Sequence, residues 1–379
     1  MAGGSPEIRP GLLAARPIPH PYPRICLEGP FDEGPRGASY AGRLSHAAAS
    51  YATLEAVLAG PDKACRSAQE LDRALTELED RGLIGWDREA NRYDAHPIVR
   101  GVVWQLTEAK DQRAVYTALE AHFEPMATPD WEKVETLADL TPAIERYHTL
   151  VNLGRYDDAY ALFRACLDFA THYRLAALRE RIAWLERLFP DGVDSLPVLT
   201  ESDAQGYAFN ALALSYQLSG QPGRSAPPFR RASEIYESRG DARGRRVALL
   251  NLGYTLGQIG ALREAAGALR RALVLSSGLD ETFLEGISLY ELGYVLCTTG
   301  DHVAGRVALS RSRRLFMKRG QPQLEGVSAA YLAQRSLWLG EFVKAGAWAE
   351  RAWELAGRQR VEWDFIRADD ARSGRSRCA

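Results

Sequence analysis

The feature that most constrains this chain is a glycine that recurs every forty residues, at positions 220, 260, 300 and 340. A leucine stands eight residues before each glycine, a small residue follows that leucine, and another small residue lies twelve residues after the glycine. The three columns are Leu212, Leu252, Leu292 and Leu332, then Ala213, Gly253, Gly293 and Ala333, then Ala232, Ala272, Ser312 and Ala352. Self-similarity at a fixed period indicates a repeat architecture in which each unit stacks on the next.

Each unit is predicted to be two antiparallel helices joined at the recurring glycine, because glycine tolerates the left-handed backbone of a tight turn. The leucine fills the space between the helices, and the small residues stand where the helices cross closely. One unit cannot bury its apolar face alone, so neighbours must stack into a superhelix. The predicted fold class is therefore all-α, an α-α superhelix.

This pattern resembles the tetratricopeptide repeat (TPR) over about residues 206–365, although the usual unit is about 34 residues long. The forty-residue period implies either longer helices or longer linkers. Pro227 and Pro228 depart from the pattern and should kink the second helix of the first unit. Residues 363–379 begin like another first helix and then lose their apolar residues, so the array predicted at 201–379 should end in an incomplete repeat.

The segment before the array has a different pattern. Leu71, Leu75 and Leu78 keep helical spacing up to Gly82, and two short apolar runs then flank the polar turn at 87–91. A helix followed by a β-hairpin is the back half of a winged helix, so a small winged-helix-like domain is predicted. The proposed divisions are 1–44 mostly disordered, 45–104 winged-helix-like with an earlier helix at 48–60, and 105–200 an irregular helical linker with TPR-like hairpins.

The runs "RGLI" at 81–84 and "NRYDAHPIVR" at 91–100 resemble the winged-helix piece of signal-transduction ATPases of the STAND (NB-ARC/AP-ATPase-like) class. In that family a P-loop ATPase module precedes this piece, and the repeat array senses a ligand or partner. A P-loop needs Gly-Lys followed by Ser or Thr. None of the five lysines has those neighbours; they are Lys63, Lys110, Lys133, Lys318 and Lys344. The resemblance thus implies a sensor arm whose NTPase module is separate or lost.

Charge and composition disfavour several other classes. The net charge of −2 does not suit an electrostatic nucleic-acid binder. The helix predicted at 67–82 has five acidic residues against two arginines, which phosphates would repel, so DNA is not the expected partner. A stretch from Arg224 to Arg246 has a net charge of +4 and is either a solvated surface or a site for an acidic peptide. No apolar run is long enough to span a membrane, and a cytoplasmic location is predicted.

No motif for catalysis, metal binding or a cofactor stands out, so the protein is predicted to be neither an enzyme nor a cofactor carrier. The five cysteines are scattered and form no Cys-x-x-Cys pair. Cys297 lies near His302, but a packed small residue is the favoured interpretation. His96 and Arg100 are interpreted as structural residues at the base of the hairpin.

The predicted binding site is a groove lined by the first helix of each repeat. Tyrosines there would give a large contact area at low entropic cost, although about half of the positions could serve ordinary packing between repeats. The groove residues are Tyr207, Asn210, Leu214, Gln217, Leu250, Tyr254, Tyr290, Tyr294 and Gln334. The function predicted is a non-catalytic protein- or peptide-binding scaffold, the sensor arm of a STAND-type protein. The alternatives are a transcriptional regulator that uses the winged helix and a non-functional fragment of a larger NTPase gene.

Overall fold

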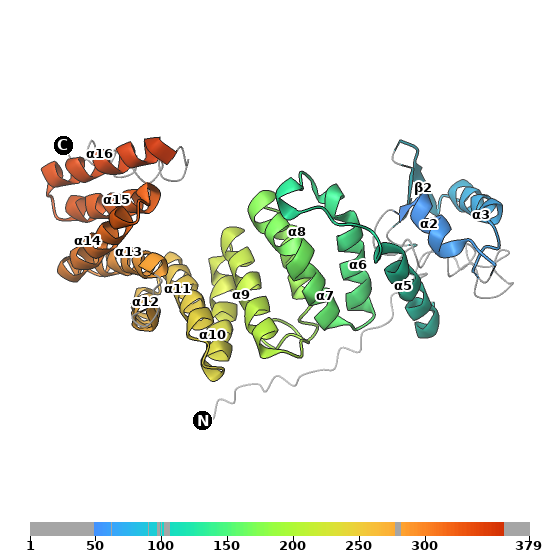
Figure 1. The fold of residues 1–379 in the computed structure, drawn as a ribbon, viewed down its shortest axis with the longest axis horizontal. Helices are drawn as coiled ribbons and strands as arrows, with labels where there is room; N and C mark the ends of the chain where they lie inside the picture. The colour runs from blue at the N-terminus through green and yellow to red at the C-terminus, as the bar shows by residue number, and fades with distance from the viewer. Residues whose placement is uncertain are drawn as a thin grey trace, which may run out of the picture. The chain divides into compact units, whose positions relative to one another are not determined.

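The computed structural model describes residues 49–61, 63–89, 91–96, 99, 101, 107–276 and 282–359. These described residues form two compact units, one that ends at residue 122 and one that begins at residue 123 (Figure 1). The predictions for residues 1–44, for Arg100 and for the incomplete repeat at 363–379 lie outside the described residues. The division into four predicted parts stays a prediction.

The first unit holds a three-stranded antiparallel sheet in the order β1-β3-β2, formed by β1 (Ala49–Ser50), β2 (Ile84–Asp87) and β3 (Arg92–Ala95). The pairing runs from Ile84 opposite Ala95 to Asp87 opposite Arg92, so β2 and β3 form the predicted hairpin. Strand β1 was not predicted, because two residues are too few to show an alternating pattern.

Two helices pack with this sheet, α2 (Tyr51–Leu58) and α3 (Ala68–Asp80). The hydroxyls of Ser50 and Ser67 accept hydrogen bonds from the first turn of α2 and α3, as helix caps do. Gly82 follows α3 with φ of +67°, which confirms it as the stop of this helix. The predicted leucines of α3 are buried in the core of the unit, which is winged-helix-like in having a helix that leads into a hairpin.

Helix α5 (Ala109–Phe123) ends at the first residue of the second unit, and irregular helices follow it. They are η3 (Trp131–Lys133), η4 (Leu137–Leu140), α6 (Thr141–Asn152), α7 (Tyr156–Leu162), η5 (Phe163–Leu167), η6 (Ala170–Arg174) and α8 (Leu178–Glu186). The predicted hinge between α6 and α7 is confirmed, with Gly154 at φ +76°. Elements η5 and η6 are π-helical, a rare geometry that often occurs at functional positions.

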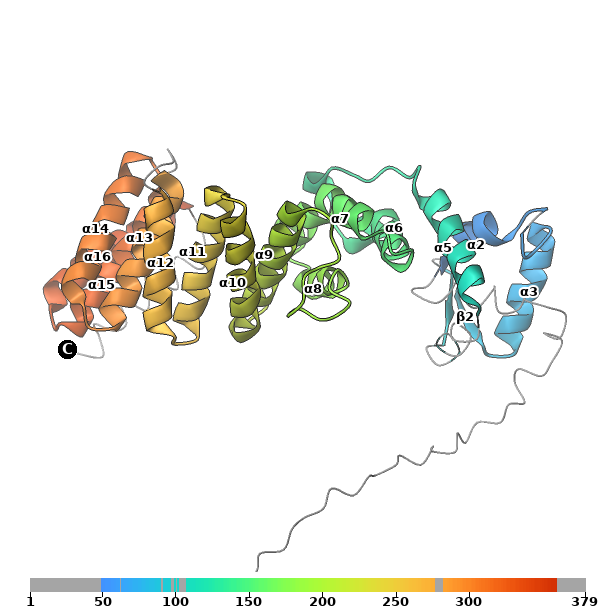
Figure 2. The same ribbon diagram turned by 90° about the horizontal axis from the view of Figure 1, so that it is seen from below.

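Within the described ranges, eight regular helices follow, and each begins twenty residues after the one before it (Figure 2). They are α9 (Ser202–Leu218), α10 (Pro222–Ser238), α11 (Ala242–Gln258), α12 (Leu262–Ser276), α13 (Thr282–Thr298), α14 (His302–Lys318), α15 (Pro322–Trp338) and α16 (Phe342–Gln359). Most have seventeen residues and are joined by three. The forty-residue period therefore comes from longer helices and not from longer linkers. The eight helices form four TPR-type pairs.

The columns of the repeat have the predicted roles. All four turn glycines adopt the left-handed region, with φ between +69° at Gly340 and +91° at Gly300. The four leucines are buried. A Cβ atom added to Gly253 would lie 2.5 Å from Leu269, and one added to Gly293 would lie 2.6 Å from Leu309. These two positions are small because the paired helices touch there.

The two prolines do not end their helix, since α10 runs through both Pro227 and Pro228. Proline lacks an N–H donor, but its carbonyl still accepts bonds from the next turn. Pro228 and Phe229 are buried, so packing against the neighbouring helices holds the segment. The helix is thus continuous through both prolines, and the kink stays a prediction.

One further column was not noticed in the sequence. Gly206 and Gly286 lie against Tyr236 and Phe316, and an added Cβ atom would come within 3.0 Å and 2.5 Å of those rings. In the second repeat the sizes are reversed, because Arg246 stands in the glycine column and Ser276 in the aromatic column, both of them buried. The spacing of the repeats is thus unchanged, but in the second repeat the large side chain of this pair comes from the first helix instead of the second.

Candidate partner-binding face

We call the first helix of each repeat, α9, α11, α13 or α15, its A helix, and we call the half-exposed side chains on these helices the A-helix face. Two predicted groove residues, Leu250 and Tyr290, are buried and serve the core. The other seven are half-buried and lie on this face; they are Tyr207, Asn210, Leu214, Gln217, Tyr254, Tyr294 and Gln334.

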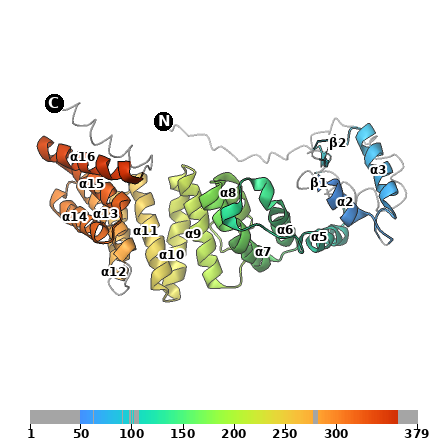
Figure 3. The same ribbon diagram turned by 45° about the horizontal axis from the view of Figure 1, so that its top comes forward.

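Helices α13 and α15 lie side by side and contact each other (Figure 3). Aromatic rings gather on their part of the A-helix face. Tyr294 stacks on Tyr331 with ring centroids 4.7 Å apart, and its ring centroid lies 6.2 Å from that of Trp338. Buried Tyr290 lies beneath, 6.0 Å from Tyr331. Trp338 is 43% exposed. We call Tyr290, Tyr294, Tyr331 and Trp338 the aromatic end.

Tyr331 and Trp338 were missing from the predicted groove. The prediction used helix positions 207, 210, 214 and 217 and their equivalents forty residues on. Positions 211 and 218 lie on the same helix face, three and four residues from the chosen ones. Their equivalents in the fourth repeat are Tyr331 and Trp338. A prediction that also included positions 211 and 218 and their equivalents would therefore have found both residues.

A charged network holds the other end of the face. Tyr207 donates its hydroxyl to Asp168 over 2.5 Å, and the Arg164 guanidinium lies 3.6 Å from the centre of the Tyr207 ring. Asp168 also pairs with Arg164 and, at 2.5 Å, with Arg181, which is 2% exposed. Burial raises the pKa of Tyr207, and the Asp168 carboxylate raises it further. We call Arg164, Asp168, Arg181 and Tyr207 the charged end.

Two amides on α9 have a buried oxygen that accepts no hydrogen bond from the described residues. These atoms are Oδ1 of Asn210 and Oε1 of Gln217. An unsatisfied buried acceptor costs about 1–3 kcal/mol, so such atoms indicate a place where a donor from elsewhere would be stabilising.

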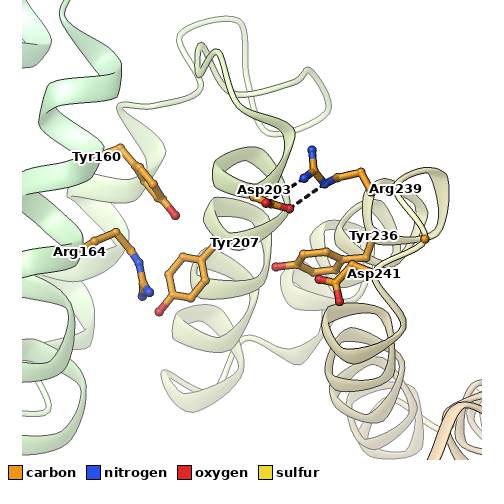
Figure 4. A pocket seen from close by; sticks show the side chains of 8 residues that line it. Tyr160, Arg164, Asp203, Tyr207, Tyr236, Arg239 and Asp241 are labelled. Carbon is orange, nitrogen blue, oxygen red and sulfur yellow. Dashed lines mark hydrogen bonds and ion pairs between the residues drawn. The ribbon is translucent and has the colours of Figure 1, made fainter. Parts of the chain in front are cut away.

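A cavity of about 440 Å³ opens beside the charged end (Figure 4). Side chains from α7, η5, α9 and α10 and from the turn before α11 line it. We call it the tyrosine pocket, and its lining residues are Tyr160, Arg164, Asp203, Tyr207, Tyr236, Arg239, Gly240 and Asp241.

The basic stretch from Arg224 to Arg246 meets acidic residues from other helices. Arg224 pairs with Glu186 of α8, Arg230 with Glu264 of α12, and Arg239 with Asp203 of α9. Arg231 and Arg245 pair with Glu234 and Glu237 inside the stretch. This neutralisation supports the interpretation of the stretch as a solvated surface.

Cys297, which was considered for catalysis, occupies a packing position, whereas His96 is exposed. Cys297 is 3% exposed, and burial raises the pKa of its thiol to about 11, so the nucleophilic thiolate is scarce. A Cβ atom added to Gly305 would lie 2.3 Å from its sulfur. The backbone N–H of His96 donates to the Leu83 carbonyl and extends the hairpin.

Among the residues that the structure describes, no helix is long and apolar enough to cross a membrane. The same residues contain no group of three or more His, Cys, Asp or Glu placed to hold a metal ion.

No protein-family model and no curated protein matches this sequence. Several solved structures match the fold of this chain. A STAND protein with a tetratricopeptide repeat sensor from Pyrococcus horikoshii is 17% identical, with a TM-score of 0.47 over 90% of this chain and 53% of that one. A Rap protein complexed with competence and sporulation factor is 14% identical, with a TM-score of 0.46 over 69% of this chain and 75% of that one. BtubC from P. vanneervenii is 18% identical, with a TM-score of 0.42 over 67% of this chain and 93% of that one.

The chain spans about half the length of the STAND protein. Similarities of this strength do not transfer a function between proteins. The TPR-type architecture is established by the helices of this chain itself, through their twenty-residue spacing and their left-handed glycine turns.

Proposed function

We propose that the A-helix face binds an extended segment of a partner protein and that the chain is a non-catalytic recognition scaffold. The carrying observation is that the face presents aromatic rings and unsatisfied amide acceptors on A helices that follow one another in register. Exposed tryptophan and tyrosine side chains are the usual anchors of binding energy. Backbone N–H groups of a bound segment would satisfy Asn210 and Gln217.

The character of the face favours an apolar or aromatic partner segment. Tyr294, Tyr331, Gln334 and Trp338 are uncharged, and five arginines of the basic stretch are paired as described above. A segment with bulky side chains would cover the aromatic end, and its backbone would run toward α9.

The experiment is to select peptides from a random display library on the whole chain and to measure their affinity by fluorescence polarisation. Trp338→Ala and Tyr294→Ala should each weaken the best peptide at least tenfold, as expected of aromatic anchors. Val343→Ala is the matched control, since Val343 is 86% exposed on α16, outside the A helices. Equal affinities for all three variants would contradict the proposal.

The finer proposal is that this scaffold is the sensor arm of a STAND-type protein and acts with an NTPase module. It is supported by the resemblance of residues 81–84 and 91–100 and by the order of a winged-helix-like unit before a TPR-type array. Crosslinked co-purification with mass spectrometry tests it, and an NTPase of this class should be enriched. Recovery of no NTPase would count against it.

A further inference from the structure

The tyrosine pocket has the size of a small-molecule site. Its volume of about 440 Å³ falls in the range of roughly 300–1,000 Å³ that such sites occupy. Three phenol rings, two arginines and two aspartates line it, so its surface is more polar than apolar. Polar groups placed in this way fix the orientation of a ligand.

Tyr236 provides an unused hydrogen-bond donor in this pocket. The residue is 8% exposed, and its ring is held between Gly206 and Gly244, where added Cβ atoms would come within 3.0 Å and 2.7 Å of it. Figure 4 shows its hydroxyl directed toward Tyr207, and no hydrogen bond joins this hydroxyl to any residue that the structure describes. Burial, with a contribution from Asp241, raises the pKa of Tyr236, so the hydroxyl stays protonated and can donate.

The charges around the pocket are separated. On one wall, Arg164 shares the single carboxylate of Asp168 with Arg181, which leaves that wall positive. On the other, the Asp241 carboxylate accepts from the backbone N–H groups of Arg243 and Gly244 and pairs with no cationic side chain within the described ranges. Figure 4 shows the rings of Tyr207 and Tyr236 between Arg164 and Asp241.

The remaining pair at the pocket neutralises itself. Arg239 Nε lies 2.7 Å from Asp203 Oδ1, and its Nη2 donates to Asp203 Oδ2 at 2.9 Å, a two-bond arrangement. The pocket is therefore close to neutral as a whole but positive on one side and negative on the other. A ligand with one charge of a single sign would meet attraction on one wall and repulsion on the other.

We propose that the tyrosine pocket binds a small zwitterion, an amino acid or dipeptide with free termini. Its carboxylate faces Arg164 and Tyr160, and its ammonium group faces Asp241. Its apolar body lies beside the Tyr207 ring, and the Tyr236 hydroxyl donates to one of its oxygens.

The test is isothermal titration of the whole chain with phenylalanine and glycyl-phenylalanine, whose side chain suits aromatic walls. At least one probe should bind saturably, and acetylating its amine or amidating its carboxylate should each weaken binding at least tenfold. No saturable binding by either probe, or equal binding of either blocked form, overturns the proposal.

Two variants locate the binding. Tyr236→Phe removes only the unused hydroxyl, so it should weaken the probe about two- to tenfold and leave the stability unchanged. Tyr216→Phe is the control, because the Tyr216 hydroxyl bonds Glu186 outside the pocket. Asp241→Asn keeps a helix cap but removes the negative wall, and Asp301→Asn makes the same change at the cap of α14. If Tyr236→Phe and Asp241→Asn both leave the affinity for the probe unchanged, the assignment of binding to this pocket is wrong.

Discussion

Tyr207 at the charged end contacts charged side chains, whereas Tyr294 at the aromatic end contacts other aromatic rings. Tyr207 bonds Asp168 and lies under Arg164, in a network anchored by the buried Arg181. Tyr294 stacks on Tyr331 beside the exposed Trp338. Both tyrosines lie on A helices, in the first and the third repeat.

The two ends of the A-helix face therefore differ in how strongly their contacts fix the local geometry. Removing a partner from a buried ion network leaves an uncompensated charge, so the network specifies one geometry and resists change. Stacked rings at a half-exposed site can shift without such a penalty and offer contact area to a partner. The charged end thus fixes the first repeat on the irregular helices, and the aromatic end is the part of the face for which we propose binding.

The largest expected effect comes from breaking the charged end. Arg181→Met should lower the free energy of unfolding by about 3–5 kcal/mol, because Asp168 keeps its charge while it loses its buried partner. Urea unfolding measures this loss. The control is Arg231→Met, which removes an exposed pair with Glu234 and should cost at most about 1 kcal/mol. A loss for Arg181→Met no larger than that of the control would show that the network is not structural.

The packing beneath the aromatic end should respond less. Gly286→Ala places a Cβ atom 2.5 Å from Phe316, a neighbour of Tyr290, and overpacking of this kind costs about 1–3 kcal/mol. Gly267→Ala, on α12, meets nothing within 4 Å and should stabilise the chain by about 0.5–1 kcal/mol. Thermal unfolding compares the two, and an equal shift in both variants would refute the close approach at Gly286.

Alkaline pH should act on the tyrosines around the charged end. Burial raises the pKa of Tyr160 to about 12 and also raises that of Tyr207 and Tyr236, whereas tyrosine in the unfolded chain titrates near 10. The unfolded state therefore loses these protons first, and stability falls as the pH rises above about 10. Ultraviolet absorbance should show tyrosines that ionise late in the folded chain. A single folded-state transition near pH 10 would contradict this, and Tyr160→Phe should make the fall in stability shallower.

The smallest effect on stability is expected at Asn210, between the two ends of the face. Its Oδ1 atom is buried and bonds nothing that the structure describes. Asn210→Ala relieves the cost of this unsatisfied acceptor but also removes the packing of the side chain, so the two effects should nearly cancel and change the free energy of unfolding by less than about 0.5 kcal/mol. The same variant should weaken the selected peptide, because the amide is a proposed contact. Unchanged peptide affinity would place the bound segment away from α9.

Much of the array could be predicted from the sequence because the signals are local. The turn glycines, the leucine column and the small-residue columns each depend on neighbours within one helical pair. The hairpin of the first unit was also predictable, since only the short polar run 88–91 separates its two strands. The two-residue strand β1 and the size exchange between Gly206 and Arg246 gave no such local pattern.

By itself the sequence determined the period, the paired helices and the A-helix face. Only the tertiary structure decided which polar groups meet. Asp168 bonds Tyr207, thirty-nine residues away, and three arginines of the +4 stretch pair with Glu186, Glu264 and Asp203 from other helices. The physical reason is that helix and turn formation depend on near neighbours along the chain, whereas charge pairing depends on which faces the stacking brings together.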